Sequence, residues 1–270
     1  MKLISKNKDK ETPAKKHDSA ASSEKPKNVL NSDSKFAIVE GYKIARTNLV
    51  FSLTAQNSNC VALTSWSKGE GKSTATVNLA ISFAKMGKTV LLLDTDLRRP
   101  NLHNLLKLKN ETGITDIIAQ MASFEDAVHR DVITCLDVLT SGPIPPNPSE
   151  LLASPVFSDL LNKAKETYDY VILDTPPLGV VADTLLLKDF VGGYVLVVRE
   201  RITSHGEIER ALLNVRLADS KVLGFLKVGC EMRSKGYGYK KYRYRYGYRY
   251  GYRYNYRYRY GYNYNYNYRY

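Results

Sequence analysis

Residues 65–74 read SWSKGEGKST and follow directly on the apolar run CVALT at residues 60–64. The apolar run predicts a buried strand, and VNLAISFAK at residues 77–85 predicts a helix. A strand, a glycine-bearing loop ending in Gly-Lys-Ser and a helix, in this order, are typical of a phosphate-binding loop. Glycines let backbone N–H groups converge on phosphate oxygens, and the start of the helix adds the positive end of its dipole. The stretch therefore predicts a nucleotide site.

Individual residues of this loop are expected to contact particular groups of a bound nucleotide. Lys72 is expected to reach the β- and γ-phosphates, and the Ser73 hydroxyl is expected to bind Mg²⁺. Trp66 stands where the general motif has its first glycine, so the turn must rely on Gly69 and Gly71. The residues expected to contact the nucleotide are Lys68, Gly69, Glu70, Gly71, Lys72, Ser73 and Thr74.

Two further apolar runs end in aspartate. VLLL at residues 90–93 precedes Asp94 and Asp96, and YVIL at residues 170–173 precedes Asp174. Continuous apolar runs between helical segments favour a parallel sheet buried on both faces, and ligands of such sheets gather at the carboxyl ends of the strands. The three carboxylates are therefore expected beside the loop, where they would bind Mg²⁺ together with the Ser73 hydroxyl. We expect an α/β fold, a mostly parallel sheet flanked by helices.

The positive charge of the chain is concentrated in its two ends. The formal net charge is +13, but residues 1–35 hold nine Lys against five acids, and residues 237–270 hold nine Lys or Arg and no acid. The part between them is close to neutral, which argues against a DNA-binding face on the core. We divide the chain into a disordered basic tail at 1–35, a globular domain at 36–230 and a disordered tail at 231–270.

Cysteine usage and hydropathy predict a cytoplasmic protein. Cys60, Cys135 and Cys230 are odd in number and lack the spacing of a disulfide framework or a zinc site, so we expect core residues in a reducing compartment. No apolar run approaches the ~18 residues of a membrane span. The chain is expected to be soluble, with any membrane attachment made through a partner.

Residues 36–55 predict an amphipathic helix. Its apolar face is formed by residues three or four apart. These residues are Ile38, Tyr42, Ala45, Leu49 and Leu53. Glu40, Lys43 and Arg46 recur every three residues on the same segment, and a solvated charged edge with i,i+3 pairs is the structural interpretation of that pattern.

Later segments complete the alternation of strands and helices. Strands are expected at 136–139, 192–198 and 221–228, and a helix at 208–217, whereas residues 101–135 carry no clear chemistry. In GPIPPNPSELL, residues 142–152, Asn147 is expected as a helix N-cap, Pro148 as the first helical residue and Glu150 as the partner in a capping box.

The chain ends in a stretch, residues 237–270, with seventeen tyrosines at nearly every second position. Arg, Lys, Gly and Asn separate them and no aliphatic residue is present, so the stretch cannot form a globular core. One interpretation is a tail that binds single-stranded nucleic acid or matrix through stacking and charge. Another is a substrate tethered to an enzyme, because a flexible tether gives an effective concentration of about a millimolar. The candidate phosphoacceptors are Tyr237, Tyr239, Tyr242, Tyr244, Tyr246, Tyr248, Tyr250, Tyr252, Tyr254, Tyr256, Tyr258, Tyr260, Tyr262, Tyr264, Tyr266, Tyr268 and Tyr270.

The chain resembles the bacterial tyrosine kinases (BY-kinases) of capsular and exopolysaccharide export in four motifs and in the tyrosine cluster that follows them. The four motifs are SKGEGKST, VLLLDTDLRRP, GPIPPNPSELL and VILDTPP. The resemblance covers about residues 36–270. It implies an ATP- and Mg²⁺-dependent kinase with a P-loop NTPase fold like that of the MinD and ParA proteins. It also implies autophosphorylation of the tail, in trans within an oligomer, and regulation of polysaccharide synthesis and export.

The resemblance also implies residue roles. Lys72, Asp94 and Asp96 would be catalytic, with Asp94 activating the acceptor hydroxyl, and the metal ligands would be Ser73, Asp94, Asp96 and Asp174. Glu40, Lys43 and Arg46 align with a motif that packs one subunit against the next in a ring. The Gram-positive form of the family is cytoplasmic and is recruited to the inner face of the membrane by a separate transmembrane activator. A cognate tyrosine phosphatase is expected as a further partner, and nucleic acid is not.

Three positions depart from the pattern of the family or of its nearest alternative. Lys43 replaces an arginine of the oligomer motif and loses its bidentate fork. Val228 stands where relatives carry an asparagine that helps to recognise adenine. The MinD/ParA positioning ATPases, the first alternative, carry a signature lysine five residues before the P-loop lysine. Ser67 occupies that position here and Lys68 lies one place later, which favours the kinase.

Overall fold

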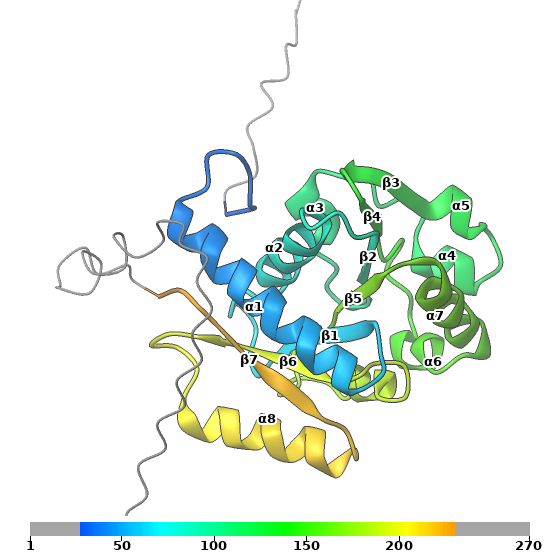
Figure 1. Cartoon of the computed structure of the whole chain (residues 1–270). Helices are drawn as coiled ribbons and strands as arrows, with labels where there is room; N and C mark the ends of the chain where they lie inside the picture. The colour runs from blue at the N-terminus through cyan, green and yellow to red at the C-terminus, as the bar shows by residue number, and fades with distance from the viewer. Residues whose placement is uncertain (1–27, 231–270) are drawn as a thin grey trace, which may run out of the picture. The chain divides into compact units, whose positions relative to one another are not determined.

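The computed structural model of the chain describes residues 28–230. This part of the chain forms a seven-stranded sheet in the order β3-β4-β2-β5-β1-β6-β7, flanked by helices on both faces (Figure 1). All neighbouring strands are parallel except β3 and β4. The strands are β1 Cys60–Ser65, β2 Val90–Asp94, β3 Val128–Ile133, β4 Leu136–Leu139, β5 Tyr170–Asp174, β6 Tyr194–Arg199 and β7 Val222–Val228. The helices are α1 Phe36–Ala55, α2 Lys72–Ala84, α3 Leu102–Leu106, α4 Ile114–Ile118, α5 Phe124–Ala127, α6 Pro148–Leu152, α7 Pro155–Thr167, the 3₁₀-helix η1 Asp183–Leu187 and α8 His205–Leu217.

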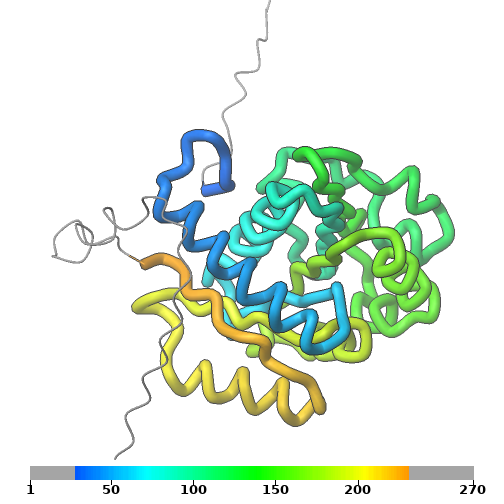
Figure 2. The backbone as a smooth tube through the Cα atoms, in the orientation of Figure 1, coloured from blue at the N-terminus to red at the C-terminus, as the bar shows by residue number. Residues whose placement is uncertain are grey.

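Both faces of the sheet are buried, as the continuous apolar runs predict. Alternate residues of each strand point to opposite faces. In β1, Cys60 and Ala62 belong to one buried cluster with side chains of α4, α6, α7 and α8, whereas Val61 and Leu63 belong to the cluster on the other face with side chains of α1, α2 and α3. In Figure 2, α1 in blue crosses beside the edge strand β7 in orange. The predicted α/β fold is confirmed.

The register of the central strands positions the acidic residues. β1 lies between β5 and β6, and β5 lies between β1 and β2. Asp94, the last residue of β2, is directly opposite Asp174, the last residue of β5. The phosphate loop follows the same end of β1, so all three elements meet at the carboxyl edge of the sheet.

Two local predictions are wrong. β3, an antiparallel edge strand, was not expected in residues 101–135, because its sequence VHRDVI is mostly polar and exposed and contains a register shift. At α6, Asn147 is the N-cap and Pro148 the first helical residue, but the capping box does not form. The Asn147 side chain instead donates to the Glu150 carboxylate (2.6 Å).

The predicted basic tail at 1–35 is also wrong over its last residues. Val29 and Leu30 are buried in the core beside α1 and α2. The Leu30 N–H donates to Asn78 Oδ1 (2.8 Å), and Asn78 Nδ2 donates to the Asn28 carbonyl (2.9 Å). The globular domain therefore begins before residue 36. The predictions for residues 1–27 and 231–270 lie outside the described residues.

The α1 helix begins and ends where the sequence predicts. Tyr42, Ala45, Leu49 and Leu53 pack on the core, whereas Ile38 at the start of the same face is 41% exposed.

Of the helices in residues 28–230, none combines the length and apolar character needed to cross a membrane. All three cysteines are free, and Cys230 is exposed, contrary to the expectation of a core residue.

Candidate nucleotide-binding site

The phosphate loop has the backbone shape that its glycines predict. Gly69 and Gly71 have φ values of +78° and +86°, a region in which residues with a Cβ are strained. Trp66, in the place of the first glycine, packs partly buried against the core. A Cβ on Gly179 would lie 2.7 Å from Trp66. The turn therefore depends on two glycines within the loop and on a third that makes room for the tryptophan.

Lys72 is the cation that pairs with the acids at the strand ends. It is the first residue of α2, and its Nζ lies 2.7 Å from Asp174 Oδ1, 3.8 Å from Asp96 Oδ2 and 3.2 Å from Ser73 Oγ. Thr76, one turn further along α2, donates to the same Asp174 oxygen (3.1 Å). The structure thus brings together the loop lysine, the loop hydroxyl and the acids of two strands, as predicted.

Asp94 lies behind this group and has no exposed surface. Its Oδ2 accepts the backbone N–H groups of Asn101 and Leu102, both at 2.9 Å. Burial, with the Asp174 charge adding to it, raises the pKa of Asp94 to about 7. Within the described residues, Asp94 Oδ1 and Asp174 Oδ2 are buried without a hydrogen-bond partner. Two orphaned carboxylate oxygens beside a lysine form a donor set that a divalent cation fits.

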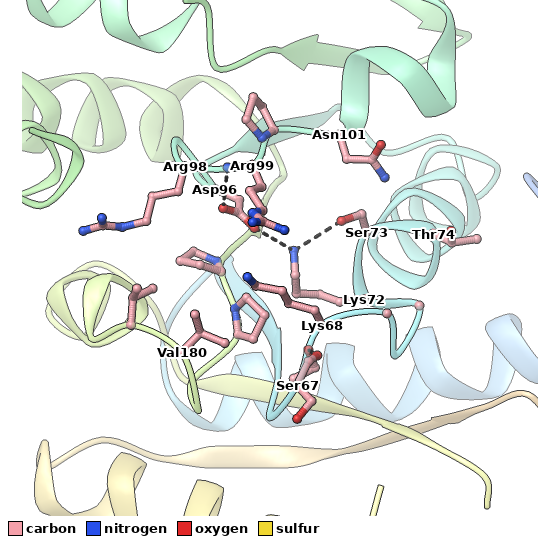
Figure 3. Close-up of a pocket in the computed structure, with 17 residues that line it drawn as sticks. Ser67, Lys68, Lys72, Ser73, Thr74, Asp96, Arg98, Arg99, Asn101 and Val180 are labelled. Carbon is pink, nitrogen blue, oxygen red and sulfur yellow. Dashed lines mark hydrogen bonds and ion pairs between the residues drawn. The ribbon is translucent and has the colours of Figure 1, made fainter. Parts of the chain in front are cut away.

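Asp96 is the acid that reaches open space. It lines a cavity of about 510 Å³ together with residues of the phosphate loop (Figure 3). In that view Ser73 and Thr74 approach from one side, and Arg98 and Val180 from the other. Burial raises the pKa of Asp96, and the Lys72 charge opposes that rise. The cavity walls are Ser65, Ser67, Lys68, Gly69, Gly71, Lys72, Ser73, Thr74, Asp96, Arg98, Arg99, Pro100, Asn101, Pro176, Pro177, Val180 and Val181.

Glu70 does not face this cavity, contrary to its predicted place among the nucleotide contacts. Its side chain is 1% exposed. One carboxylate oxygen accepts the Ser67 N–H (2.9 Å), and the other accepts the Thr203 hydroxyl. The sequence indicates only that Glu70 stands inside the phosphate loop, and no local pattern indicates Thr203, which lies 133 positions away.

Sequence reasoning also missed a cluster formed by Arg98, Ser149 and Asp183. Arg98 Nε donates to Asp183 Oδ2 (2.6 Å), and Arg98 Nη2 donates to Ser149 Oγ (2.9 Å). Ser149 in turn donates to Asp183 Oδ1 (2.8 Å). Burial pushes the pKa of Asp183 up, but the bonds from Arg98 and Ser149 outweigh it, and the pKa is lowered. The cluster connects GPIPPNPSELL to the loop after β2. In the sequence these segments appear only as two separate motifs, and nothing there indicates that they are in contact.

The predicted oligomer motif lies on α1, away from the cavity. Lys43 Nζ pairs with Glu40 (2.8 Å) on the outer face of the helix. Arg46 points inward, because its Nη1 donates to the Ser82 carbonyl of α2 (2.6 Å). The same outer face carries Ile44 and Phe51, which are 62% and 70% exposed. Arg46 thus serves the contact between α1 and α2 within one chain.

Val228 and the metal ligands complete the set of predicted positions. Val228 lies beside the phosphate loop, since a Cβ on Gly71 would be 3.6 Å from its Cγ2, but it does not line the cavity.

In the part of the chain that the structure describes, no group of three or more His, Cys, Asp or Glu side chains could hold a metal by itself. Mg²⁺ is usually bound by one or two carboxylates together with substrate phosphates.

Comparison with known proteins identifies related chains. The sequence model of the family described as AAA domain matches residues 58–206. The tyrosine-protein kinase YwqD of Bacillus subtilis (strain 168) is 42% identical over 201 residues, which is 74% of this chain and 85% of YwqD. The solved structure of the chimerical protein CapA2B2 is 35% identical, with a TM-score of 0.69, and the match covers 73% of this chain and 86% of that one. The septum site-determining protein MinD of Pyrococcus horikoshii OT3, solved with Mg-ADP, is 23% identical with a TM-score of 0.53 over 62% of this chain and 68% of that one, and shares the fold.

Proposed function

The chain belongs to the bacterial tyrosine kinases, and we propose that it transfers the γ-phosphate of Mg²⁺-bound ATP to tyrosines in its own residues 237–270. One observation carries the proposal: Lys72, Ser73 and Asp96 surround a single cavity at the carboxyl edge of the sheet. Incubation of the full chain with γ-labelled ATP and Mg²⁺ tests it, and the expected result is label on the tail.

Each residue of the site is assigned a role in phosphoryl transfer. The catalysis required is mainly positioning and charge stabilisation, and Lys72 supplies a fixed positive charge for it. Ser73 and Asp96, with the unpartnered oxygens of Asp94 and Asp174, would hold Mg²⁺, which neutralises and orients the phosphates when bound. Because Asp96 lines the cavity and Asp94 has no exposed surface, we assign the contact with the acceptor hydroxyl to Asp96. Asp94 then holds the loop after β2 in place through its bonds to Asn101 and Leu102.

The tyrosines of the core support the tail as the acceptor. Four of the 21 tyrosines of the chain lie outside residues 237–270, and none of the four is exposed. Tyr168 donates to Asp137 (2.6 Å), Tyr194 donates to the Thr184 carbonyl (2.8 Å), and the Tyr42 oxygen accepts from Asn78 (3.3 Å). Tyr170 packs on Phe83. Transfer to the core would require unfolding part of it.

An apolar wall beside Asp96 suits the phenol ring of an acceptor. The wall, residues 176–181, contributes two prolines and two valines to the cavity, and Val180 is 49% exposed. It is rigid, because the Leu178 N–H donates to the Ser65 carbonyl (2.8 Å) and the Gly179 N–H donates to the Trp66 carbonyl (2.9 Å). An apolar surface beside a phosphate site contributes nothing to phosphate binding, but it favours tyrosine over a water acceptor.

Substitution Val180→Ala should therefore separate transfer from hydrolysis. Loss of the two methyl groups that would contact the ring is expected to lower kcat/KM for a peptide of the tail about tenfold. Hydrolysis of ATP by water should be unchanged. Ile144→Ala is the matched control, since Ile144 is β-branched, 65% exposed and outside the cavity. Equal losses of transfer and hydrolysis would mean that the wall serves the nucleotide instead.

The outer face of α1 is proposed as the contact between copies of the chain. It combines the Glu40–Lys43 pair with Ile44 and Phe51, two large apolar side chains in open solvent. Exposed apolar groups rimmed by charge are characteristic of protein interfaces. Assembly through α1 would let the tail of one copy enter the cavity of its neighbour.

The double substitution Ile44→Asp with Phe51→Asp should yield single chains. Two buried carboxylates without partners would oppose association strongly, so light scattering after size exclusion should report the mass of one chain. The wild-type chain is expected to elute as an oligomer. Met121→Asp, at a side chain 79% exposed outside α1, should leave the oligomer intact. An unchanged oligomer in the double variant would remove α1 from the interface.

Further proposals follow from the family. We propose that the chain acts in the cytoplasm, that a separate transmembrane activator recruits it to the inner face of the membrane, and that a tyrosine phosphatase reverses its reaction. Control of capsular or exopolysaccharide synthesis and export is the proposed purpose. A positioning ATPase is disfavoured by Ser67 at the place of the signature lysine and by the likeness to MinD, which extends to the fold alone.

A further inference from the structure

A buried carboxylate lies inside the phosphate loop, between its two left-handed glycines. Glu70 accepts the Ser67 N–H on one oxygen (2.9 Å) and the Thr203 hydroxyl on the other, and it is 1% exposed. Both donors are neutral, so neither offsets the negative charge. A carboxylate here costs desolvation energy and repels the phosphates that the loop must hold. Its presence therefore points to a task in shaping the loop.

The bond from Ser67 to Glu70 fixes the curvature of the loop. It spans three residues, and it turns the Ser67 N–H toward the carboxylate. Glycine is the most permissive residue, so the left-handed φ values of Gly69 and Gly71 on either side of Glu70 must be held by contacts around them. An internal acceptor that closes the turn reduces the conformations the loop must lose when a ligand binds.

The other oxygen of Glu70 connects the loop to the turn after β6. The Thr203 hydroxyl oxygen also accepts the Arg199 N–H (2.9 Å), so it is held on both sides. Arg199 Nη1 donates to the Gly69 carbonyl (3.1 Å), and the Ser67 hydroxyl donates to Glu207 Oε1 (3.3 Å). Residues 67–70 and 199–207 are thus joined by three side-chain contacts that the phosphates do not use.

We propose that Glu70 and Thr203 are positioning residues that hold the phosphate loop in its binding shape, so that nucleotide affinity depends on the turn after β6. The inference rests on the proposed function only in that the site binds a nucleotide. It goes beyond that function because it places the control of affinity on a segment outside the phosphate loop and outside both acidic strands.

A double-mutant cycle on the full chain tests the link. The dissociation constant of a non-hydrolysable ATP analogue with Mg²⁺ is measured by calorimetry for Glu70→Ala, Thr203→Val and the double variant. Loss of a hydrogen bond to a charged group is expected to raise the constant about tenfold in each single variant. The double variant should be no weaker than the worse single one, because both changes break the same link. Thr203→Ser, which keeps the hydroxyl, should restore wild-type affinity.

The controls separate positioning from general stability. Thr167→Val removes a hydroxyl that donates to the Lys163 carbonyl on the surface of α7 (2.8 Å), and it should leave affinity unchanged. In Thr203→Val the KM for ATP should rise by a larger factor than kcat falls, whereas a mere loss of folded protein would lower kcat and leave KM unchanged. Affinities within twofold of wild type in folded single variants, or effects that multiply in the double variant, would overturn the proposal. If Glu70→Ala does not fold, Thr203→Val and its rescue by serine decide alone. The analogue binds whether or not tyrosine is the acceptor, so this result is independent of the kinase assay.

Discussion

Substitution Lys72→Met should abolish transfer of phosphate to the tail, with a loss of about a thousandfold or more, as when a main transition-state charge contact is removed. Lys72 provides the positive charge nearest to Asp96 and Asp174, and methionine has a similar length without the charge. Incorporation of label from γ-labelled ATP into the full chain measures the effect. Label that persists in Lys72→Met would place the transfer elsewhere.

The same substitution should weaken the fold, which calls for a second variant. Lys72 and Asp174 are 8% and 1% exposed, and removal of one partner from such a pair costs about 3 kcal/mol. Lys72→Arg keeps a charge opposite Asp174 but changes the shape of the cation, so it should fold and still lose transfer. Lys85→Met, at an exposed lysine just after α2, should retain full transfer. Equal losses in Lys72→Met and Lys85→Met would point to instability.

Replacement of all seventeen tyrosines of residues 237–270 by phenylalanine should reduce self-phosphorylation to background. The change removes each acceptor oxygen and keeps the ring and the interleaved Arg and Lys residues. Hydrolysis of ATP should continue, because the site that holds the phosphates lies entirely within residues 65–181. The two rates are measured on the same sample, one as phosphoprotein and one as free phosphate.

A variant with the nine Lys and Arg of residues 237–270 replaced by Gln, and all tyrosines kept, is the matched control. If the tail is a substrate, this variant should still be phosphorylated. Phosphorylation retained by the phenylalanine variant would refute the tail as the acceptor. Salt-dependent binding of single-stranded RNA at low micromolar concentration, lost in the glutamine variant alone, would instead support a nucleic-acid tail.

The position of the site could be predicted because it depends on strand ends. The apolar runs before Ser65, Asp94 and Asp174 predict three buried parallel strands, and the register places Asp94 opposite Asp174. Continuous apolar runs, and the rule that ligands gather at the carboxyl edge of a parallel sheet, were enough for this. Because Trp66 replaces the first glycine of the motif, the turn was expected to rely on Gly69 and Gly71, and both have left-handed φ values.

Side-chain direction could not be predicted in the same way. Asp94 and Asp96 are two residues apart, yet only Asp96 lines the cavity, because backbone N–H groups after β2 capture Asp94. Arg98 and Asp183 are 85 positions apart, and Glu70 and Thr203 are 133 apart. Such contacts arise from the tertiary fold and leave no periodic trace in one sequence. Residue type even misleads for Glu70, since a glutamate is rarely buried without a cation.

Phosphosite mapping by mass spectrometry of the full chain, isolated from its own cells, tests the central claim most directly. If the phosphate held at Lys72 is transferred to the tail, phosphotyrosine should be found within residues 237–270. None should be found at the four core tyrosines, Tyr42, Tyr168, Tyr170 and Tyr194. The same pattern should appear in vitro with Mg²⁺, ATP and the cytoplasmic segment of the activator. An unmodified tail in a chain that hydrolyses ATP, or phosphate confined to residues outside the tail, would contradict the claim.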